Sequence, residues 1–313
     1  MNQRKIGILI SYVNILLQTV INFIYVPILL YYIGKSEYGL YQLIGSFIAY
    51  FSIMDFGLTA AVVRFYTKYK TLNDKISMEN VLAISTRCYI VITLILFIIG
   101  YICYLFLDDI FYNSMTSSEI SSAKNIFILL LLNIVITIST MIFRAIINAH
   151  EKFLFLKGIE TIQLVLQPIL VIVILQENPY AFSVALVQTV LNIFLSIARC
   201  VYCFRNLKIR IKYHYWDKKL FREFKKLALS VFIVTLIDQV FFKTNQIILG
   251  VISGTEAVAV YAIASLIYMN YKALSVAISG VFLPHITEMI AKRESMKIIS
   301  DLFIKIGRWQ YFC

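Results

Sequence analysis

Charged residues are scarce in this chain. They account for 15% of its 313 residues, and hydrophobic residues account for 60%. A soluble domain is about a quarter charged and nearer half apolar, so this composition excludes an ordinary soluble domain. The apolar residues form blocks of roughly 20 or more, the length that crosses a hydrocarbon core at about 1.5 Å per residue. We therefore predict an all-α integral membrane protein, a polytopic helical bundle.

Residues that support metal binding and catalysis are also few. The chain has three histidines, and its single Cys-x-x-Cys pair, Cys200 and Cys203, has no second pair and no histidine nearby. Such a pair is typical of packing rather than of a metal or redox site. No glycine-rich nucleotide-binding loop is present. We predict no metal site, no catalytic residue and no cofactor, and leave open coupling to a proton or sodium gradient.

Acidic residues are outnumbered, with 17 Asp and Glu against 29 Lys and Arg. The basic residues gather in alternate links between the apolar blocks, above all in residues 205–226. Because cytoplasmic links carry such an excess, orientation explains the net charge of +12 better than nucleic-acid binding does. No cleavable signal peptide is evident. We predict a multi-pass protein whose N-terminus is cytoplasmic.

The predicted spans group into two lobes. Residues 1–204 hold one complete six-helix lobe, and residues 227–313 hold two spans and the start of a third, which the chain end cuts short. The linker 205–226 has apolar residues every three or four positions, which predicts an amphipathic helix on the cytoplasmic membrane surface. This stripe consists of Trp216, Leu220, Phe224 and Leu227. The predicted spans are 6–33, 39–66, 80–107, 122–149, 154–175, 180–204, 227–251, 257–285 and one beginning near 298.

Two stretches far apart in the sequence are similar. Residues 34–41 (GKSEYGLY) align without gaps on residues 254–261 (GTEAVAVY), so that Gly34 matches Gly254 and the final tyrosines also match. Each stretch is predicted to turn the chain on the outer side between two long spans. Because both units begin on the cytoplasmic side, we predict a parallel repeat, as between the halves of some transporters.

Seven charged residues fall within the predicted spans and are candidates for a substrate cavity. An ionised carboxylate in mid-bilayer is costly, so it indicates a functional site and needs a partner. Asp55 lies near the middle of the span 39–66, with Lys272 as its candidate partner across the lobes. Basic side chains would attract a diphosphate, which arginine binds through two hydrogen bonds. The seven are Asp55, Arg64, Arg87, Arg144, Asp238, Lys243 and Lys272.

A plainer interpretation of these charges stays open. Asp55 or Asp238 would pair with Lys272 for assembly, and basic residues near span ends would extend to the membrane surface. On a straight helix Arg64 lies about 13.5 Å beyond Asp55 and half a turn away, so the two do not pair. A proline inside a span usually kinks the helix. The hinge candidates are Pro27, Gly57 and Pro168.

Several short motifs together resemble a known family. Residues 23–34 (FIYVPILLYYIG), 37–41 (EYGLY) and 54–58 (MDFGL) are similar to the N-terminal signature of polysaccharide-transport proteins. These are the oligosaccharide and O-antigen flippases of the multidrug/oligosaccharidyl-lipid/polysaccharide exporter superfamily. Residues 245–250 (NQIILG) and 257–264 (AVAVYAIA) resemble the seventh and eighth spans of that family.

The resemblance implies two six-helix lobes around a central cavity. Family members move undecaprenyl-diphosphate-linked oligosaccharide to the outer leaflet of the bacterial cytoplasmic (inner) membrane by alternating access, for surface polysaccharide such as O-antigen or capsule. The implied partners are the polyprenyl-diphosphate-linked oligosaccharide, membrane lipids and the polysaccharide polymerase or ligase machinery. The chain departs from the pattern by ending in its ninth span and by carrying Asn245 and Gln246 where many relatives place an acid.

Three alternatives stay open beside a flippase. A membrane-embedded polysaccharide polymerase or glycosyltransferase would need a substantial extramembrane loop with clustered acids, His or Arg, and the outer links here are short. A multidrug antiporter of the same superfamily would take cationic substrates, which a cationic interior disfavours. The third alternative is an inactive, truncated flippase. The favoured prediction is a flippase and not an enzyme.

Overall fold

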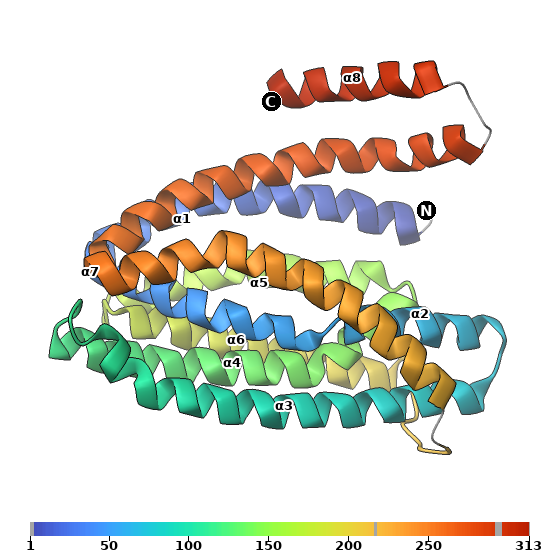
Figure 1. Cartoon of the computed structure of the whole chain (residues 1–313), viewed down its shortest axis with the longest axis horizontal. Coiled ribbons are helices and arrows are strands. Elements are labelled where there is room, and N and C mark those ends of the chain that lie inside the picture. Colours follow the sequence, from blue (N-terminus) through green and yellow to red (C-terminus); the bar gives the residue numbers. More distant parts are fainter. Residues whose placement is uncertain (1–2, 216–217, 292–295, 313) are drawn as a thin grey trace.

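The chain forms a bundle of long helices in a computed structural model, which describes residues 3–215, 218–291 and 296–312. Most helices run along one common direction, so the bundle has two ends (Figure 1). No strand occurs in these ranges, which confirms the predicted all-α bundle. The elements are α1 (Gln3–Phe51), η1 (Ser52–Asp55), α2 (Leu58–Thr71), α3 (Lys75–Phe111), α4 (Ser117–Ala149), α5 (Phe153–Leu175), α6 (Ala181–Arg205), α7 (Lys218–Ala291) and α8 (Met296–Phe312).

Two of the helices are interrupted by glycine. Gly34 in α1 has φ 75° and ψ 176°, and Gly254 in α7 has φ 77° and ψ −172°. Only glycine adopts this conformation readily, because it has no Cβ. At each kink the chain turns back, so α1 and α7 each have a first and a second arm (Figure 1). The matching conformations of Gly34 and Gly254 confirm the predicted alignment of the repeat.

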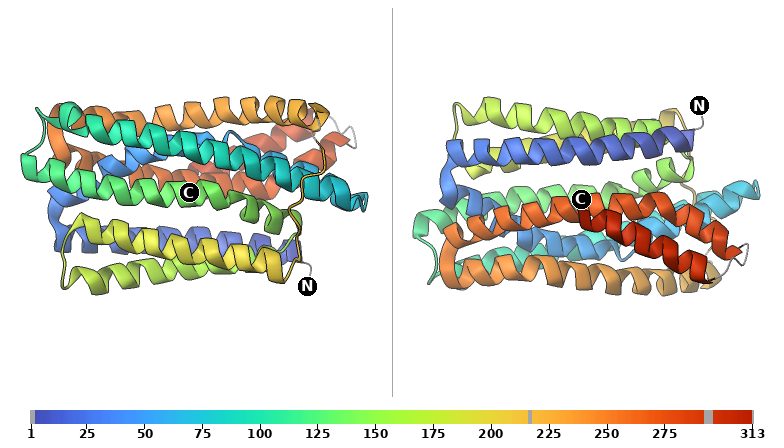
Figure 2. Two further views of the ribbon diagram at one scale, coloured as in Figure 1. Left: turned by 90° about the horizontal axis from the view of Figure 1, so that it is seen from below. Right: turned by 90° about the horizontal axis from the view of Figure 1, so that it is seen from above.

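The links lie alternately at the two ends of the bundle (Figures 1 and 2). One end holds both glycine kinks and the α3–α4 and α5–α6 links; we call it the kink end. The opposite end holds the α2–α3, α4–α5 and α6–α7 links, with Lys152 and Lys208 in two of these links and Lys70 in the last turn of α2; we call it the basic end. Six helices in the described part of the chain are long and apolar enough to cross a membrane. Which end faces the cytoplasm stays a prediction.

The predicted continuous span 39–66 is wrong. After Phe51 the chain forms the short 3-10 helix η1, and Phe56 and Gly57 then take the left-handed φ values 47° and 68° before α2 begins. The separation calculated for Asp55 and Arg64 on a straight helix therefore does not apply. The break needs glycine at its second position, since a Cβ on Gly57 would also lie 2.6 Å from Cβ of Val231.

The proline candidates do not interrupt their helices. Pro27 lies inside α1 and Pro168 inside α5, and the non-helical residue within α1 is Gly34 instead. Of the three predicted hinges, Gly57 is thus the one at a break in the backbone. Motion at any of them stays a prediction.

Side-chain caps define the starts of α3 and α4. Asp74 accepts hydrogen bonds from Oγ of Ser77 at 2.6 Å and from its backbone nitrogen at 3.0 Å. These bonds stabilise the carboxylate and hold the pKa of Asp74 below its usual value. At α4, Thr116 and Glu119 form a reciprocal capping box. Both caps lie at bundle ends and fix where the long helices begin.

Polar side chains join α4 to α6 inside the first lobe. Nδ2 of Asn192 donates to Oδ1 of Asn133 at 2.9 Å and to Oγ1 of Thr137 at 2.7 Å. One or two turns further, Thr140 donates to Ser196 at 3.1 Å. Such hydrogen bonds hold helices together in lipid, where apolar burial supplies little driving force between them. The six-helix lobe therefore has a polar ladder at its centre.

Within the predicted linker 205–226, residues 218–226 are helical, and their place on the membrane surface stays a prediction. Residues 208–215 have no regular secondary structure, and helix begins again at Lys218 and runs directly into α7. Trp216 lies outside the described residues, as do the side chains of Leu220, Phe224 and Leu227. We call residues 207–215 the strap. The division of the chain into domains stays a prediction.

Candidate functional site

The two repeated units meet along a seam between the second arm of α1 and α7, which contributes its first arm and the residues just after its kink. Gly39 lies so close to α7 that a Cβ there would be 1.8 Å from the carbonyl oxygen of Thr255. Gly250 lies against Leu43 in the same way, with a Cβ 2.5 Å from Cδ1. Small residues let membrane helices approach this closely. The glycines therefore hold the two units together near the kink end.

Polar side chains bridge the same seam further from the kink end. The hydroxyl of Ser46 donates to Oε1 of Gln246, and both residues are buried. The hydroxyls of Tyr50 and Thr244 lie 2.5 Å apart. Gln246 stands where the family resemblance leads to an acid, and here its amide binds a serine. The middle of the seam is thus closed by neutral hydrogen bonds.

One carboxylate ties the two kinks together. Oε1 of Glu119 on α4 accepts from Oγ of Ser36 at 2.6 Å and from Oγ1 of Thr255 at 3.1 Å. The two hydroxyls lie 3.1 Å from each other. We call these three residues the kink-end junction. Hydrogen bonds to an ionised group are about twice as strong as neutral ones, so the junction favours closure at this end.

Asp55 has partners other than the one predicted. Its Oδ1 accepts hydrogen bonds from Thr59 and Tyr89, each at 2.9 Å. Lys272 instead places Nζ 4.2 Å from the centroid of the Phe242 ring. The predicted pairing of Asp55 with Lys272 is therefore wrong, because two hydroxyls within the first lobe already bind this carboxylate. Asp55 remains a half-buried acid beside the break between η1 and α2.

A pocket of about 770 Å³ opens between the two arms of α7. Asn245 donates to the hydroxyl of Tyr261 at 3.0 Å within it. Lys272 reaches one of its lining residues, and Lys243, which is half-buried, lies between two of them along the helix. An apolar pocket with a few polar groups is typical of ligand sites. Its lining includes Phe241, Phe242, Thr244, Asn245, Tyr261 and Tyr268.

The other predicted cavity residues lie elsewhere. Arg87 stacks on Tyr213 of the strap, with its guanidinium 3.9 Å from the ring centroid. Arg144 pairs with Glu160 of α5 at 2.9 Å. Arg64 on α2 and Asp238 on α7 are exposed. The structure therefore divides the seven predicted residues among several places. Lys272 contacts Phe242 of the pocket of α7, and Lys243 follows Phe242 in the sequence.

Sequence reasoning missed the residues of the kink-end junction. Ser36 and Thr255 closely follow the two repeat glycines, which is the one signal that pointed to them. In the sequence, Glu119 is one acid of a short polar link and carries no other signal. Arg199, inside the predicted span 180–204, is a further charge near Arg144 and Glu160. Across the residues that the structure describes, no three His, Cys, Asp or Glu side chains are grouped to hold a metal ion.

Fold and seam together resemble those of membrane transporters built from repeated helical units. An inward-facing multidrug resistance MATE family transporter of the MOP superfamily matches with a TM-score of 0.65 at 15% identity, over 88% of this chain and 63% of its own. A MOP superfamily transporter from Pyrococcus furiosus matches with a TM-score of 0.61 at 14% identity, over 90% of this chain and 64% of its own. The MATE multidrug transporter DinF-BH matches with a TM-score of 0.63 at 13% identity, over 90% of this chain and 64% of its own. At these identities the likeness shows the fold alone.

The chain belongs to the polysaccharide biosynthesis protein family, whose model matches residues 5–290. This confirms the family resemblance found in the sequence. No curated protein matches the chain. The chain spans about 64% of the length of the solved structures it resembles.

Proposed function

We propose that this protein is a flippase for polyprenyl-diphosphate-linked oligosaccharides in the bacterial cytoplasmic membrane, acting in the synthesis of a surface polysaccharide such as O-antigen or capsule. The observation that carries the proposal is the seam. Two equivalent kinked helices, one from each unit, meet along it in a chain of the polysaccharide biosynthesis family. A transporter that opens alternately to two sides needs two such bodies and a contact that can break.

The kink end is assigned to the outside, because the opposite end carries the lysine-rich links. Gly39 and the kink-end junction close the seam there. The conformation is then one that is closed to the outside. For the outer side to open, the hydroxyls of Ser36 and Thr255 must move apart. Water then replaces the hydrogen bonds that these hydroxyls donate to the carboxylate of Glu119.

The pocket of α7 suits an anionic glycolipid head group. The C–H faces of sugar rings pack on aromatic side chains such as Tyr268, and sugar hydroxyls pair with amides such as Asn245. Lys243 and Lys272 supply positive charge for the diphosphate. The polyprenyl tail stays in the bilayer. A proton or sodium gradient is the proposed energy source, with Asp55 and Asp238 as the carboxylates that would sense it.

The proposal is tested by deleting the gene in its own bacterium. Lipid-linked repeat units are expected to accumulate on the cytoplasmic side, and surface polysaccharide to fall. The wild-type gene is expected to restore export, and the double variant Lys243→Gln/Lys272→Gln to restore much less. The matched control is Lys124→Gln, because Lys124 pairs with Asp108 at the kink end.

Normal surface polysaccharide in the deletion strain, with no second flippase gene, would refute the proposal. Loss of resistance to cationic dyes in the same strain, with normal polysaccharide, would favour a multidrug antiporter instead. Localisation is checked in parallel by reporter fusions at Asn113 and Arg210. The account expects outside and inside respectively, and the same side for both would contradict it.

A further inference from the structure

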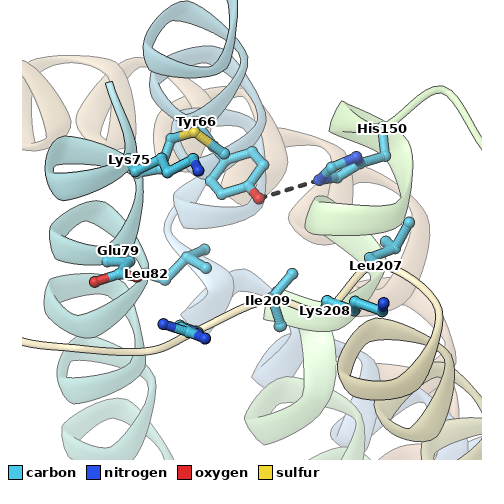
Figure 3. A pocket seen from close by; sticks show the side chains of 10 residues that line it. Tyr66, Lys75, Glu79, Leu82, His150, Leu207, Lys208 and Ile209 are labelled. Atoms are coloured by element: carbon cyan, nitrogen blue, oxygen red, sulfur yellow. Dashed lines mark hydrogen bonds between the residues drawn. The ribbon is translucent and has the colours of Figure 1, made fainter. Parts of the chain in front are cut away.

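A second pocket, of about 360 Å³, lies at the basic end beneath the strap. It is bounded by the last turns of α2, the first turns of α3, the end of α4 and the strap itself. Figure 3 shows Lys75, His150 and Lys208 around it, with the Tyr66 hydroxyl bonded to the His150 ring. It is separate from the pocket of α7, which lies between residues of that helix alone.

The lining of this pocket is strongly cationic. Lys75, Lys208 and Arg210 all contribute to it. The ion pairs found in the described part of the chain use none of these three cations. Its one carboxylate, Glu79, is engaged by His214, whose Nε2 lies 2.9 Å from Oε2. Among the residues that the structure describes, the pocket lining thus has three cations against the single carboxylate of Glu79.

The strap that carries two of these cations is anchored. The backbone nitrogens of His214 and Tyr215 both donate to Oδ1 of Asn80, at 3.1 and 3.2 Å, and Asn80 is only 1% exposed. Arg87 stacks on Tyr213 of the strap, and the strap residue Ile209 is buried. A lysine-rich link whose only role was to orient the chain in the membrane would not need these contacts to hold its backbone in place.

The backbone at the pocket is held in an uncommon conformation. Lys208 has φ 50°, in the left-handed region that a side chain with a Cβ rarely adopts. Such residues persist where the surrounding structure holds them, and they cluster at binding sites. Here the left-handed turn sits between Leu207 and Ile209, both of which also line the pocket.

The pocket also offers neutral hydrogen-bonding groups. Burial, with Lys70 and Lys152 nearby, lowers the pKa of His150 to about 4. Its imidazole is therefore neutral at neutral pH and pairs with Tyr66 at 3.0 Å. The same positive surroundings that disfavour a proton on His150 favour an anion in the pocket.

We propose that this pocket binds a phosphate or diphosphate group, held by Lys75, Lys208 and Arg210. A volume of about 360 Å³ admits a diphosphate, and three cations match its charge. The group has two possible sources, a lipid head group at the membrane surface or a soluble phosphate ester. The lipid source rests on the proposed function, and the soluble source does not. If the source is the lipid, the pocket is where the substrate first contacts the protein at the cytoplasmic face.

The test is titration of inorganic pyrophosphate into the purified protein in phosphatidylcholine nanodiscs. Affinity is measured by calorimetry, and the ring resonances of His150 report whether the anion binds beside it. The double variant Lys208→Gln/Arg210→Gln is expected to weaken binding about tenfold or more. Lys212→Gln is the matched control, because Lys212 lies on the same strap but does not line the pocket, and its affinity is expected to change less than about twofold.

Absence of pyrophosphate binding, or equal weakening in the double variant and the control, would overturn the proposal. A second arm adds undecaprenyl diphosphate to the nanodiscs. If that lipid displaces pyrophosphate, the site takes the lipid head group; if it does not, the site takes a soluble phosphate. Pyrophosphate binding without oligosaccharide transport would refute the proposed function and support the phosphate site. Oligosaccharide transport without pyrophosphate binding would support the proposed function and refute the phosphate site.

Discussion

The close approach at Gly39 makes the sharpest prediction about the seam. Replacing Gly39 with alanine adds one methyl group directly opposite the backbone of α7, 1.8 Å from the carbonyl oxygen of Thr255. Backbone cannot move aside as a side chain does. The two helices must therefore separate by about 1.2 Å before that contact reaches the 3.0 Å below which real Cβ atoms are essentially never found.

The size of the effect follows from a matched pair. Gly45 lies on the same helix arm, and a Cβ there would meet no atom within 4 Å. Gly45→Ala is expected to be neutral or to stabilise by up to about 1 kcal/mol, because alanine favours helix. Gly39→Ala gains the same preference but costs about 1–3 kcal/mol in overpacking. Separation of the helices also stretches the bonds at Ser46 and Tyr50, so we expect a difference of about 2–4 kcal/mol between the variants.

The assay is thermal unfolding of both variants in the same detergent or nanodisc. Gly39→Ala is expected to melt about 5–10 °C below Gly45→Ala. A spin-label pair at Asn113 and Glu256, both exposed at the kink end, is expected to show a wider distance distribution in Gly39→Ala. Equal melting temperatures and equal distances in the two variants would refute the close packing at the seam.

Three further predictions concern the junction, the strap and the basic end. Thr255→Val keeps the shape of the side chain but removes a hydrogen bond to ionised Glu119, worth about 1.5–3 kcal/mol; it should raise the kink-end-open population about 10–100-fold, and an unchanged spin-label distance distribution would contradict this. Asn80→Ala leaves two strap nitrogens without their acceptor, so trypsin should cleave at Lys212 about tenfold faster, and an unchanged cleavage rate would show that the strap is held by other contacts. His150 has a folded-state pKa of about 4, below its ordinary value of 6.5. Its contribution to stability is therefore complete above pH 6.5 and is lost as pH falls toward 4; His150→Gln should flatten melting temperature against pH in this window, and parallel curves for variant and wild type would exclude the burial of a neutral histidine.

Composition and repeat pattern predicted the fold well. Long apolar blocks specify membrane helices whatever their neighbours are, because each helix satisfies its own backbone hydrogen bonds in lipid. The pairing of Gly34 with Gly254 was also readable, since a glycine between two apolar blocks is where a chain can turn sharply. The family followed from short motifs in the correct order.

The break at Asp55 was not predicted. In the sequence, residues 39–66 form one apolar run, and nothing local shows that the helix stops at Phe51. Glycine is tolerated in many helices, so Gly57 alone does not reveal the left-handed φ of 68°. The approach of Val231, which leaves no room for a Cβ on Gly57, comes from far along the chain and could not be read locally.

The candidate site was predicted only in part. Lys272 contacts one residue of the α7 pocket, but Asp55 has hydroxyl partners in place of Lys272. A charged residue within a predicted span indicates a functional site, whereas a serine or threonine there does not. The kink-end junction was therefore not predicted, because Glu119 is bound by two hydroxyls. Arg87 illustrates the same limit, because its aromatic partner Tyr213 lies on the strap, where the sequence pattern showed no contact with α3.

Translocation by the purified protein tests the central claim most directly. The protein is reconstituted into liposomes with a fluorescent polyprenyl-diphosphate oligosaccharide, and an impermeant quencher reports how much of the lipid remains on the outer leaflet. The account predicts exchange between leaflets well above that of empty liposomes, slower with Lys243→Gln/Lys272→Gln and unchanged with Lys124→Gln. Exchange no faster than in empty liposomes, with a correctly folded protein in the bilayer, would contradict it.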